Sequence, residues 1–358
     1  MPENFNVSGP SHLLTRLDWT NASHRRSIAA SLVQGVYSLE HKRQRASINL
    51  ELDTQASMWY EQFQFQLNAN DILEDDEDDS SYFGAIFEFK HTHESTSTPS
   101  PPKYVVAFRG VMLTKHTRYE DMKQSLKLGM HKLEESSRFH IALKAVLDVV
   151  NRAGGPENVW LVGHSLGAAI AMLVGKNMAI FGYPLETYLF NPPYISVPIE
   201  KFIKIKPLKD GFRIANSIMK AGIAKAMNKH RDDSEEDSFV VLSEWVPYMF
   251  VNPSDLLCAE YIGYFEHREK MEEIGYGKIE RISTRCTFGS LVCSAIWRDL
   301  EPLRVVPTTY MTVNVSPSED FRQAHGIVQW WQPHFQWQSK LYKFKTTMSS
   351  SVSCTLVE

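Results

Sequence analysis

Blocks of apolar residues recur through the middle of the chain, with spacings that alternate between those of helices and strands. Residues 134–153 place apolar side chains on one stripe at helical spacing. The run 159–162 is short and apolar throughout, which is typical of a strand covered on both faces. A helix over 166–182 and a strand over 187–190 follow. This alternation predicts an α/β fold with a mostly parallel central sheet and helices on both faces.

The residues on either side of this region predict further elements but no boundary between domains. Two strand-like runs, 82–89 and 104–108, are joined by a polar, proline-containing stretch that predicts a hairpin loop. The acidic block 71–79 is interpreted as a solvated loop rather than a metal site. No internal repeat or linker is evident, so we expect one domain over residues 1–358. Its expected parts are a helical N-terminal region (1–70), a core (80–195), a helical insertion (198–238) and a segment with the acid and histidine (239–358).

The composition is that of an ordinary globular chain. Hydrophobic residues make up 43% and charged residues 22% of the 358 positions, so a large core can form. The net charge of −4 and the pI near 6.4 give no basis for nucleic-acid binding. No apolar run reaches the roughly 18 residues that a transmembrane span needs. The first residues lack the pattern of a signal peptide.

The number and spacing of the cysteines indicate the cellular compartment. There are four of them, without the CxxC or other spacing of a metal site, and such scarcity suits a reducing compartment. We therefore expect a cytoplasmic protein that uses no metal or other cofactor.

The segment Gly163-His164-Ser165-Leu166-Gly167 lies where the predicted strand meets the predicted helix. A serine hydroxyl is a weak nucleophile and must be presented and activated. In a G-x-S-x-G turn the glycines let the backbone take a strained conformation, so the serine Oγ projects from the turn. The strand before and the helix after are the context that this motif requires. Ser165 is therefore predicted to be a nucleophile, and His164 is interpreted as a residue of the turn.

A triad acid is expected downstream, because hydrolases with this turn follow the chain order serine, acid, histidine. Asp255 stands apart from the solvated acidic runs. It ends the turn Asn252-Pro253-Ser254-Asp255, which follows an apolar run, 245–251, that predicts a strand. An acid after the carboxyl end of a strand lies at the sheet edge that carries the serine. Asp255 is the predicted acid; a cap for a helix over 256–274 is the competing interpretation, and both roles are compatible.

Three histidines follow the predicted acid: His267, His325 and His334. His267 falls in a charged helical segment and is interpreted as a solvated side chain. His325 is preferred as the general base, because Gly326 beside it permits a close approach to the nucleophile. His334 stays open as the alternative.

Two segments, 163–168 and 104–110, resemble the class 3 lipases of the α/β-hydrolase superfamily. The first is the Gly-His-Ser-Leu-Gly-Ala elbow, and the second is a strand that ends in Phe-Arg-Gly. Together with the turn 252–255 and the segment 324–331, they look like a plant subgroup often labelled GDSL esterase/lipase, although no Gly-Asp-Ser-Leu box occurs in this sequence. The resemblance implies an α/β-hydrolase fold.

The same resemblance implies an oxyanion hole made by the backbone N–H groups of Val111 and Leu166. Each such donor is typically worth roughly a few kcal/mol in the barrier. The family usually has Thr or Ser at position 111, whose hydroxyl braces the oxyanion, whereas valine offers only its N–H group.

These features together predict a serine carboxylester hydrolase similar to triacylglycerol lipases, which cleaves lipid or small esters through an acyl-enzyme on Ser165. Two alternatives remain: an acyltransferase with the same triad, and a catalytically silent binding protein of this fold. The insertion 198–238 is interpreted either as a lid with transient membrane-surface contact or as a helix packed on the domain.

Overall fold

The computed structural model describes residues 10–13, 17–46, 59–75, 81–90, 100–112, 119–130, 133–194, 241–273 and 306–344. The α-helices are α2 (Ala22–Ala46), α3 (Trp59–Gln62), α4 (Tyr119–Met130), α5 (Ser137–Ala153), α6 (Leu166–Ile180), α9 (Glu260–Glu273) and α13 (Phe321–His325). The strands are β1 (Phe65–Gln66), β2 (Ile72–Asp75), β3 (Ser81–Phe89), β4 (Tyr104–Phe108), β5 (Val159–His164), β6 (Glu186–Phe190), β7 (Tyr248–Val251), β8 (Thr309–Asn314) and β9 (Trp337–Tyr342). Short 3₁₀ helices cover Ser11–Leu13, Ala69–Asp71, Leu133–Glu135, Pro156–Asn158 and Ile327–Trp331.

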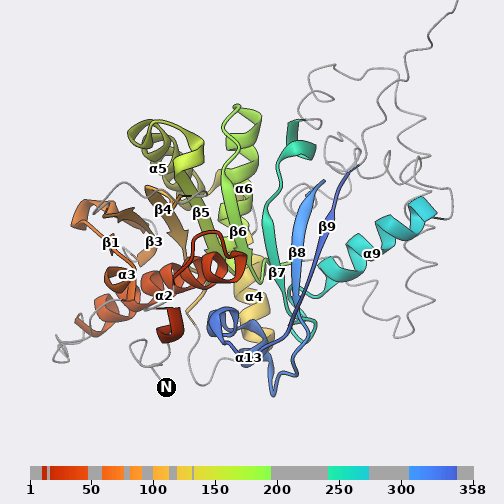
Figure 1. The fold of residues 1–358 in the computed structure, drawn as a ribbon. Coiled ribbons are helices and arrows are strands. Elements are labelled where there is room, and N and C mark those ends of the chain that lie inside the picture. Colours follow the sequence, from red (N-terminus) through yellow and green to blue (C-terminus); the bar gives the residue numbers. More distant parts are fainter. Residues whose placement is uncertain are drawn as a thin grey trace, which may run out of the picture.

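The described strands form one sheet whose centre is parallel. Strands β4 to β8 lie side by side in chain order and run parallel. Antiparallel strands flank them, with β3 beside β4, β1 and β2 beside β3, and β9 beside β8 (Figure 1). Because parallel crossovers are almost always right-handed, strands in chain order place their connecting helices on the same face. Helices α4, α5, α6 and α9 accordingly contribute to one apolar cluster.

The opposite face is covered by α2 and by the 3₁₀ helix Ile327–Trp331, and α2 runs across the strands in Figure 1. Successive side chains of a strand point to opposite faces. In β5, Leu161 belongs to the first cluster, whereas Trp160 and Val162 belong to the second cluster with Ile28 of α2. The N-terminal helix is therefore one of the two layers that bury the sheet.

The predicted α/β organisation with a mostly parallel sheet is confirmed. The predicted helix over 134–153 begins later, at Ser137, because the Ser136 Oγ accepts the Phe139 N–H at 3.3 Å and caps it. The helix ends as expected, at Gly154, whose φ of 82° is accessible to glycine without strain.

The segment that carries the predicted acid also differs in its bounds. The strand expected over 245–251 begins only at Tyr248. Pro247 before it has no N–H to give to a neighbouring strand, although its carbonyl accepts the Tyr310 N–H at 3.0 Å. The helix expected over 256–274 begins at Glu260, after a series of turns.

The interpretation of the acidic block 71–79 as a solvated loop is wrong for its described part, 71–75. Strand β2 lies here, and Asp75 is 4% exposed. Its carboxylate accepts hydrogen bonds from Arg138 Nε at 2.6 Å and from Ser137 Oγ at 2.8 Å. The local sequence gives no sign of these partners, because they lie more than 60 residues away along the chain. An acidic run without visible partners is interpreted as solvated, since buried charges need partners.

Other predictions are met only in part. The expected helical region 1–70 contains α2, but it also contains strand β1. The strands β8 and β9 were not predicted. The expected insertion 198–238 lies outside the described residues, so both interpretations of it remain predictions.

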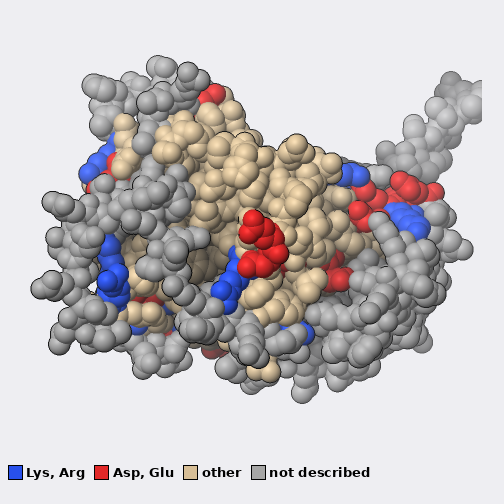
Figure 2. All heavy atoms as spheres, turned by 90° about the horizontal axis from the view of Figure 1, so that it is seen from below, with Lys and Arg blue, Asp and Glu red and all other residues tan. Residues whose placement is uncertain are grey.

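The described surface mixes acidic and basic side chains. On the face seen in Figure 2, red and blue spheres are interspersed among larger tan areas. Across the described ranges we find no helix with the length and apolar character that crossing a bilayer requires.

The absence of a side chain at Gly167 lets helix α6 pack closely against the end of β4. A Cβ added at Gly167 would lie 2.4 Å from the carbonyl oxygen of Phe108 and 2.6 Å from that of Arg109. Both contacts are with backbone, which cannot move aside as a flexible side chain can. We expect Gly167→Ala to lower the free energy of unfolding by about 1–3 kcal/mol, measured by urea denaturation.

Gly35 in α2 provides the matched control. A Cβ added there meets its nearest atom, in the ring of Phe87, at 3.4 Å. Since alanine is the better helix former, Gly35→Ala should leave stability unchanged or raise it by up to about 1 kcal/mol. Equal stability losses in the two variants would contradict the packing argument.

Candidate active site

Four neighbouring strands end at the same edge of the sheet, and each is followed by a residue of the site. Gly110 lies just beyond β4, Ser165 follows β5, and Asn191 follows β6. Asp255 lies in the turn after β7. The carboxyl edge of a parallel sheet is where ligands and functional side chains gather in open α/β folds.

The turn between β5 and α6 is strained. Ser165 has φ 56° and ψ −124°, a conformation that side-chain-bearing residues rarely adopt. A Cβ at Gly163 would lie 2.2 Å from the carbonyl oxygen of Gly167, so the turn can close only with a glycine there. The Ser165 N–H donates to the Phe190 carbonyl at 3.0 Å and ties the turn to β6. This geometry is the strained strand-to-helix turn that the motif predicts.

The turn after β7 is built by side-chain to backbone hydrogen bonds. The Asn252 Oδ1 accepts the Ser254 N–H at 2.8 Å, and the Asn252 carbonyl accepts the Asp255 N–H at 3.0 Å. Asp255 is 1% exposed, and its Oδ1 accepts the Leu257 N–H at 3.1 Å. The carboxylate therefore caps the following turns and remains free to bind through its other oxygen, so both roles weighed for this residue are compatible with the geometry.

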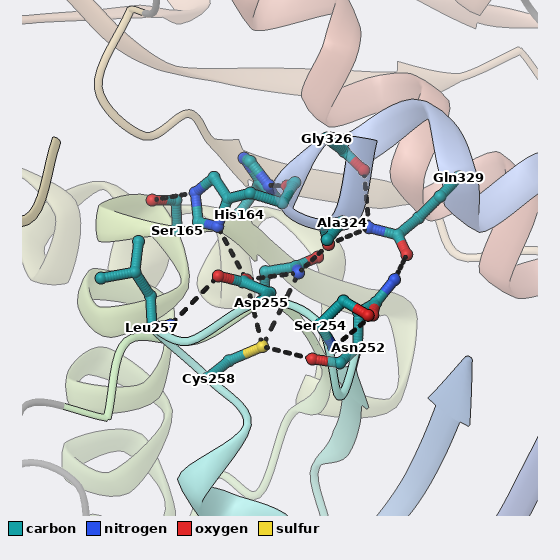
Figure 3. A network of polar contacts seen from close by, with 12 residues as sticks. His164, Ser165, Asn252, Ser254, Asp255, Leu257, Cys258, Ala324, Gly326 and Gln329 are labelled. Atoms are coloured by element: carbon teal, nitrogen blue, oxygen red, sulfur yellow. Dashed lines mark hydrogen bonds and ion pairs between the residues drawn. The ribbon is translucent and has the colours of Figure 1, made fainter. Parts of the chain in front are cut away.

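The Asp255 Oδ2 receives three donors. They are the His325 Nδ1 at 2.8 Å, the Asn191 Nδ2 at 2.8 Å and the Cys258 Sγ at 3.1 Å (Figure 3). On the other side of its ring, the Nε2 of His325 lies 2.9 Å from Ser165 Oγ. The structure thus brings Ser165, His325 and Asp255 together in one continuous chain of hydrogen bonds.

His325 is held by a short capped helix. The Asp320 Oδ1 accepts the Gln323 N–H at 2.8 Å and starts α13, which ends at His325. Gly326 serves this geometry for a different reason from the one expected: a Cβ there would lie 2.9 Å from the Arg322 carbonyl oxygen, within α13 itself. The missing side chain relieves crowding in the helix end rather than contact with the nucleophile.

The other two histidines beyond Asp255 lie elsewhere. His334 is exposed and packs against the ring of Phe335, with centroids 4.5 Å apart. His267, expected to be solvated, is instead buried in α9 at 6% exposure. Of these three histidines, the structure places only His325 at the serine.

The two positions proposed for an oxyanion hole flank the serine. A Cβ on Gly110, which precedes Val111, would come within 2.6 Å of the Ser165 Cβ. Leu166 follows the serine as the first residue of α6, where N–H groups have no partner inside the helix. The residue before Val111 therefore packs against Ser165, and the start of α6 follows Ser165 directly.

Two supporting residues were not found from the sequence. Asn191, fully buried with φ 46°, donates from Nδ2 to Asp255 and also to the Ala324 carbonyl at 3.0 Å. Gln329 donates from Nε2 to the carbonyls of Ala324 and Gly326 at 2.7 and 2.9 Å (Figure 3). Both fix the segment around His325. Asn191 could have been found by the rule that identified Asp255, since it follows a strand at the same edge.

His164 also does more than form the turn. It is 4% exposed, its Nε2 lies 2.7 Å from the His325 carbonyl oxygen, and its Nδ1 lies 2.8 Å from the Tyr37 hydroxyl. Burial, reinforced by the nearby His325, lowers the pKa of His164 to about 3. The ring is therefore neutral at physiological pH.

The environment of Asp255 favours its ionised form. Burial alone would raise the pKa of this carboxyl, but the charge of His325 and the donors from His325, Asn191 and Cys258 outweigh it and lower the pKa. Burial and the adjacent carboxylate raise the pKa of the Cys258 thiol well above its ordinary value, so the thiol stays protonated as a donor.

The described residues do not gather metal-binding side chains at this site or elsewhere. Within the ranges that the structure describes, no group of three or more His, Cys, Asp and Glu side chains is placed to hold a metal ion.

Comparison with known proteins finds a relative that matches nearly the whole chain. No protein-family model and no solved structure matches the chain. The chain is similar to an Arabidopsis thaliana protein named as a GDSL esterase/lipase, with 41% identity over 355 residues, which cover 96% of this chain and 98% of the relative. Since the identity extends over nearly the full length of both proteins, this chain belongs to the same esterase/lipase family as that plant protein.

Proposed function

We propose that this protein is a serine carboxylester hydrolase of the class 3 lipase type, with an α/β-hydrolase fold, which cleaves lipid or other acyl esters. Membership of an esterase/lipase family supports the hydrolysis of esters. The observation that carries the mechanism is the hydrogen-bond chain from Ser165 Oγ through His325 to Asp255, with steps of 2.9 and 2.8 Å. These distances are those expected of a nucleophile, its base and the group that orients the base.

Acylation begins at the serine. The His325 Nε2 accepts the Ser165 hydroxyl proton as the oxygen attacks the ester carbonyl. Asp255, ionised because its pKa is lowered, orients the imidazole through Nδ1 and stabilises the imidazolium that forms. The imidazolium then protonates the leaving alcohol, and an acyl-enzyme remains on Ser165.

The developing oxyanion requires donors. In our proposal the N–H groups of Val111 and Leu166 supply them, since Gly110 before Val111 packs against Ser165 and Leu166 follows Ser165 directly. The start of α6 adds its positive dipole end. Since valine has no hydroxyl, Val111 contributes its N–H alone.

Deacylation repeats the sequence with water. His325 removes a proton from a water molecule that attacks the acyl carbonyl, and the proton passes to Ser165 as the acid leaves.

We further propose that the chain is one domain, since a single sheet joins strands from residue 65 to residue 342. The cytoplasmic location stays a prediction from the sequence.

Removal of either the nucleophile or its base should strongly reduce the reaction. We expect Ser165→Ala to lose fluorophosphonate labelling, and His325→Ala to lower kcat/KM for a short-chain ester by at least about 10³-fold. His334→Ala is the matched control, because this exposed ring lies away from the serine. It should keep kcat/KM within about twofold of wild type.

Circular dichroism of each variant separates loss of chemistry from loss of fold. A folded wild type that resists the probe, with and without detergent, would refute the hydrolase mechanism. Labelling that survives Ser165→Ala would refute the choice of nucleophile. Product analysis with an added alcohol distinguishes hydrolysis from acyl transfer.

The ionised Asp255 should also contribute to stability in a pH-dependent way. Its pKa in the folded protein lies below the ordinary 3.8, so the stabilising contribution is present above pH 3.8 and is lost as the pH falls through the folded value. Asp255→Asn removes this titration. The difference in free energy of unfolding between wild type and variant, measured with urea, should be level near neutral pH and should shrink below pH 3.8. A difference that widens on acidification would contradict the lowered pKa.

A further inference from the structure

A second hydrogen-bond chain approaches the site from α2. The Tyr37 hydroxyl accepts the Gly110 N–H at 2.8 Å and lies 2.8 Å from His164 Nδ1. The other ring nitrogen of His164 lies 2.7 Å from the carbonyl oxygen of His325. Four segments that are far apart in the sequence are therefore linked in one line.

The direction of each hydrogen bond in this chain is determined. A carbonyl oxygen only accepts, so the proton of the neutral His164 ring is on Nε2 and is donated to His325. The Nδ1 is then an acceptor, and the Tyr37 O–H donates to it. The Tyr37 oxygen in turn accepts from Gly110. No other arrangement satisfies all three contacts with a neutral ring.

Gly110 is held at both of its backbone groups. While its N–H donates to Tyr37, its carbonyl accepts from Arg109 Nη1 at 2.7 Å. The Gly110 carbonyl and the Val111 N–H belong to one planar peptide unit and point in opposite directions. Fixing the carbonyl therefore fixes the direction of the Val111 N–H.

We propose that Tyr37 and His164 are positioning residues that couple the oxyanion-binding peptide at Gly110–Val111 to the main chain of the general base, His325. This inference rests on the proposed hydrolase function. The chain Gly110–Tyr37–His164–His325 sets the distance between the donor of the oxyanion hole and the imidazole. Val111 makes this coupling important, because its side chain offers no donor that could compensate for a misplaced N–H.

The test compares a half-buried and a buried tyrosine, Tyr37 and Tyr188, from which only the hydroxyl is removed. Tyr37→Phe breaks the chain, whereas Tyr188→Phe removes a hydroxyl that binds Glu186 on β6. We expect Tyr37→Phe to lower kcat for a short-chain ester between about 10-fold and 100-fold, with KM within about twofold. Tyr188→Phe should keep both constants while changing only the unfolding midpoint.

A double-mutant cycle tests whether the two residues act as one unit. His164→Gln breaks the same chain at its next residue. If either substitution alone breaks the hydrogen-bond chain, adding the other should lower kcat little further. The fold-loss in kcat of the double variant should therefore be clearly smaller than the product of the fold-losses of Tyr37→Phe and His164→Gln. Fully independent losses would overturn the coupling.

A spectroscopic measurement on the wild type keeps the inference falsifiable even if the variants unfold. The ¹⁵N chemical shifts of the His164 ring should show a proton on Nε2, and a proton on Nδ1 would overturn the inference. A reactive wild type together with Tyr37→Phe at wild-type kcat would overturn it but leave the proposed function intact. A folded wild type that neither labels with fluorophosphonate nor hydrolyses esters would overturn both.

Discussion

The order of the parallel strands is the constraint on which the rest of the structure depends. With β4 to β8 side by side in chain order, right-handed connections put the connecting helices on one face and leave the other open. The helix α2 covers that open face together with the segment after His325. The same order aligns the ends of β4, β5, β6 and β7 at one edge, where the residues of the site meet. One topological feature therefore explains both the second layer and the site.

Two residues at this edge have strained backbone conformations. Ser165 and Asn191, each directly after a strand, have positive φ angles of 56° and 46°. Such conformations cost of order 1–3 kcal/mol each and persist only when their surroundings hold them. Here the surroundings are specific: the Ser165 N–H binds the end of β6, and the Asn191 N–H binds the Phe250 carbonyl at 2.9 Å. At this edge the strain falls on the positions that present the serine and hold the acid.

Much of this arrangement could be predicted from the sequence, because local pattern and chain order carry it. The turn at Ser165 follows from a motif, and Asp255 follows from a strand end. The order of the three side chains leaves three histidines as candidates for the base, and the glycine beside His325 favoured it for a reason that the structure replaces. Tyr37 could not be found in this way, since nothing in the pattern of a long helix marks one tyrosine as reaching a site 127 residues away. Asp75 was misjudged for the same reason: its partner Arg138 is a contact of the fold and not of the sequence.

The buried carboxylate of Asp255 shows how the parts depend on each other. An isolated buried charge is costly, and this one is tolerated because three donors converge on a single oxygen while the Leu257 N–H binds the other. Two of the three donors come from outside its own loop, from Asn191 after β6 and from His325 at the end of α13. The acid can therefore be ionised and oriented only when β6, β7 and the C-terminal segment are assembled. Stability and reactivity at this edge consequently depend on the same hydrogen bonds, and a change that loosens one of these segments should weaken both.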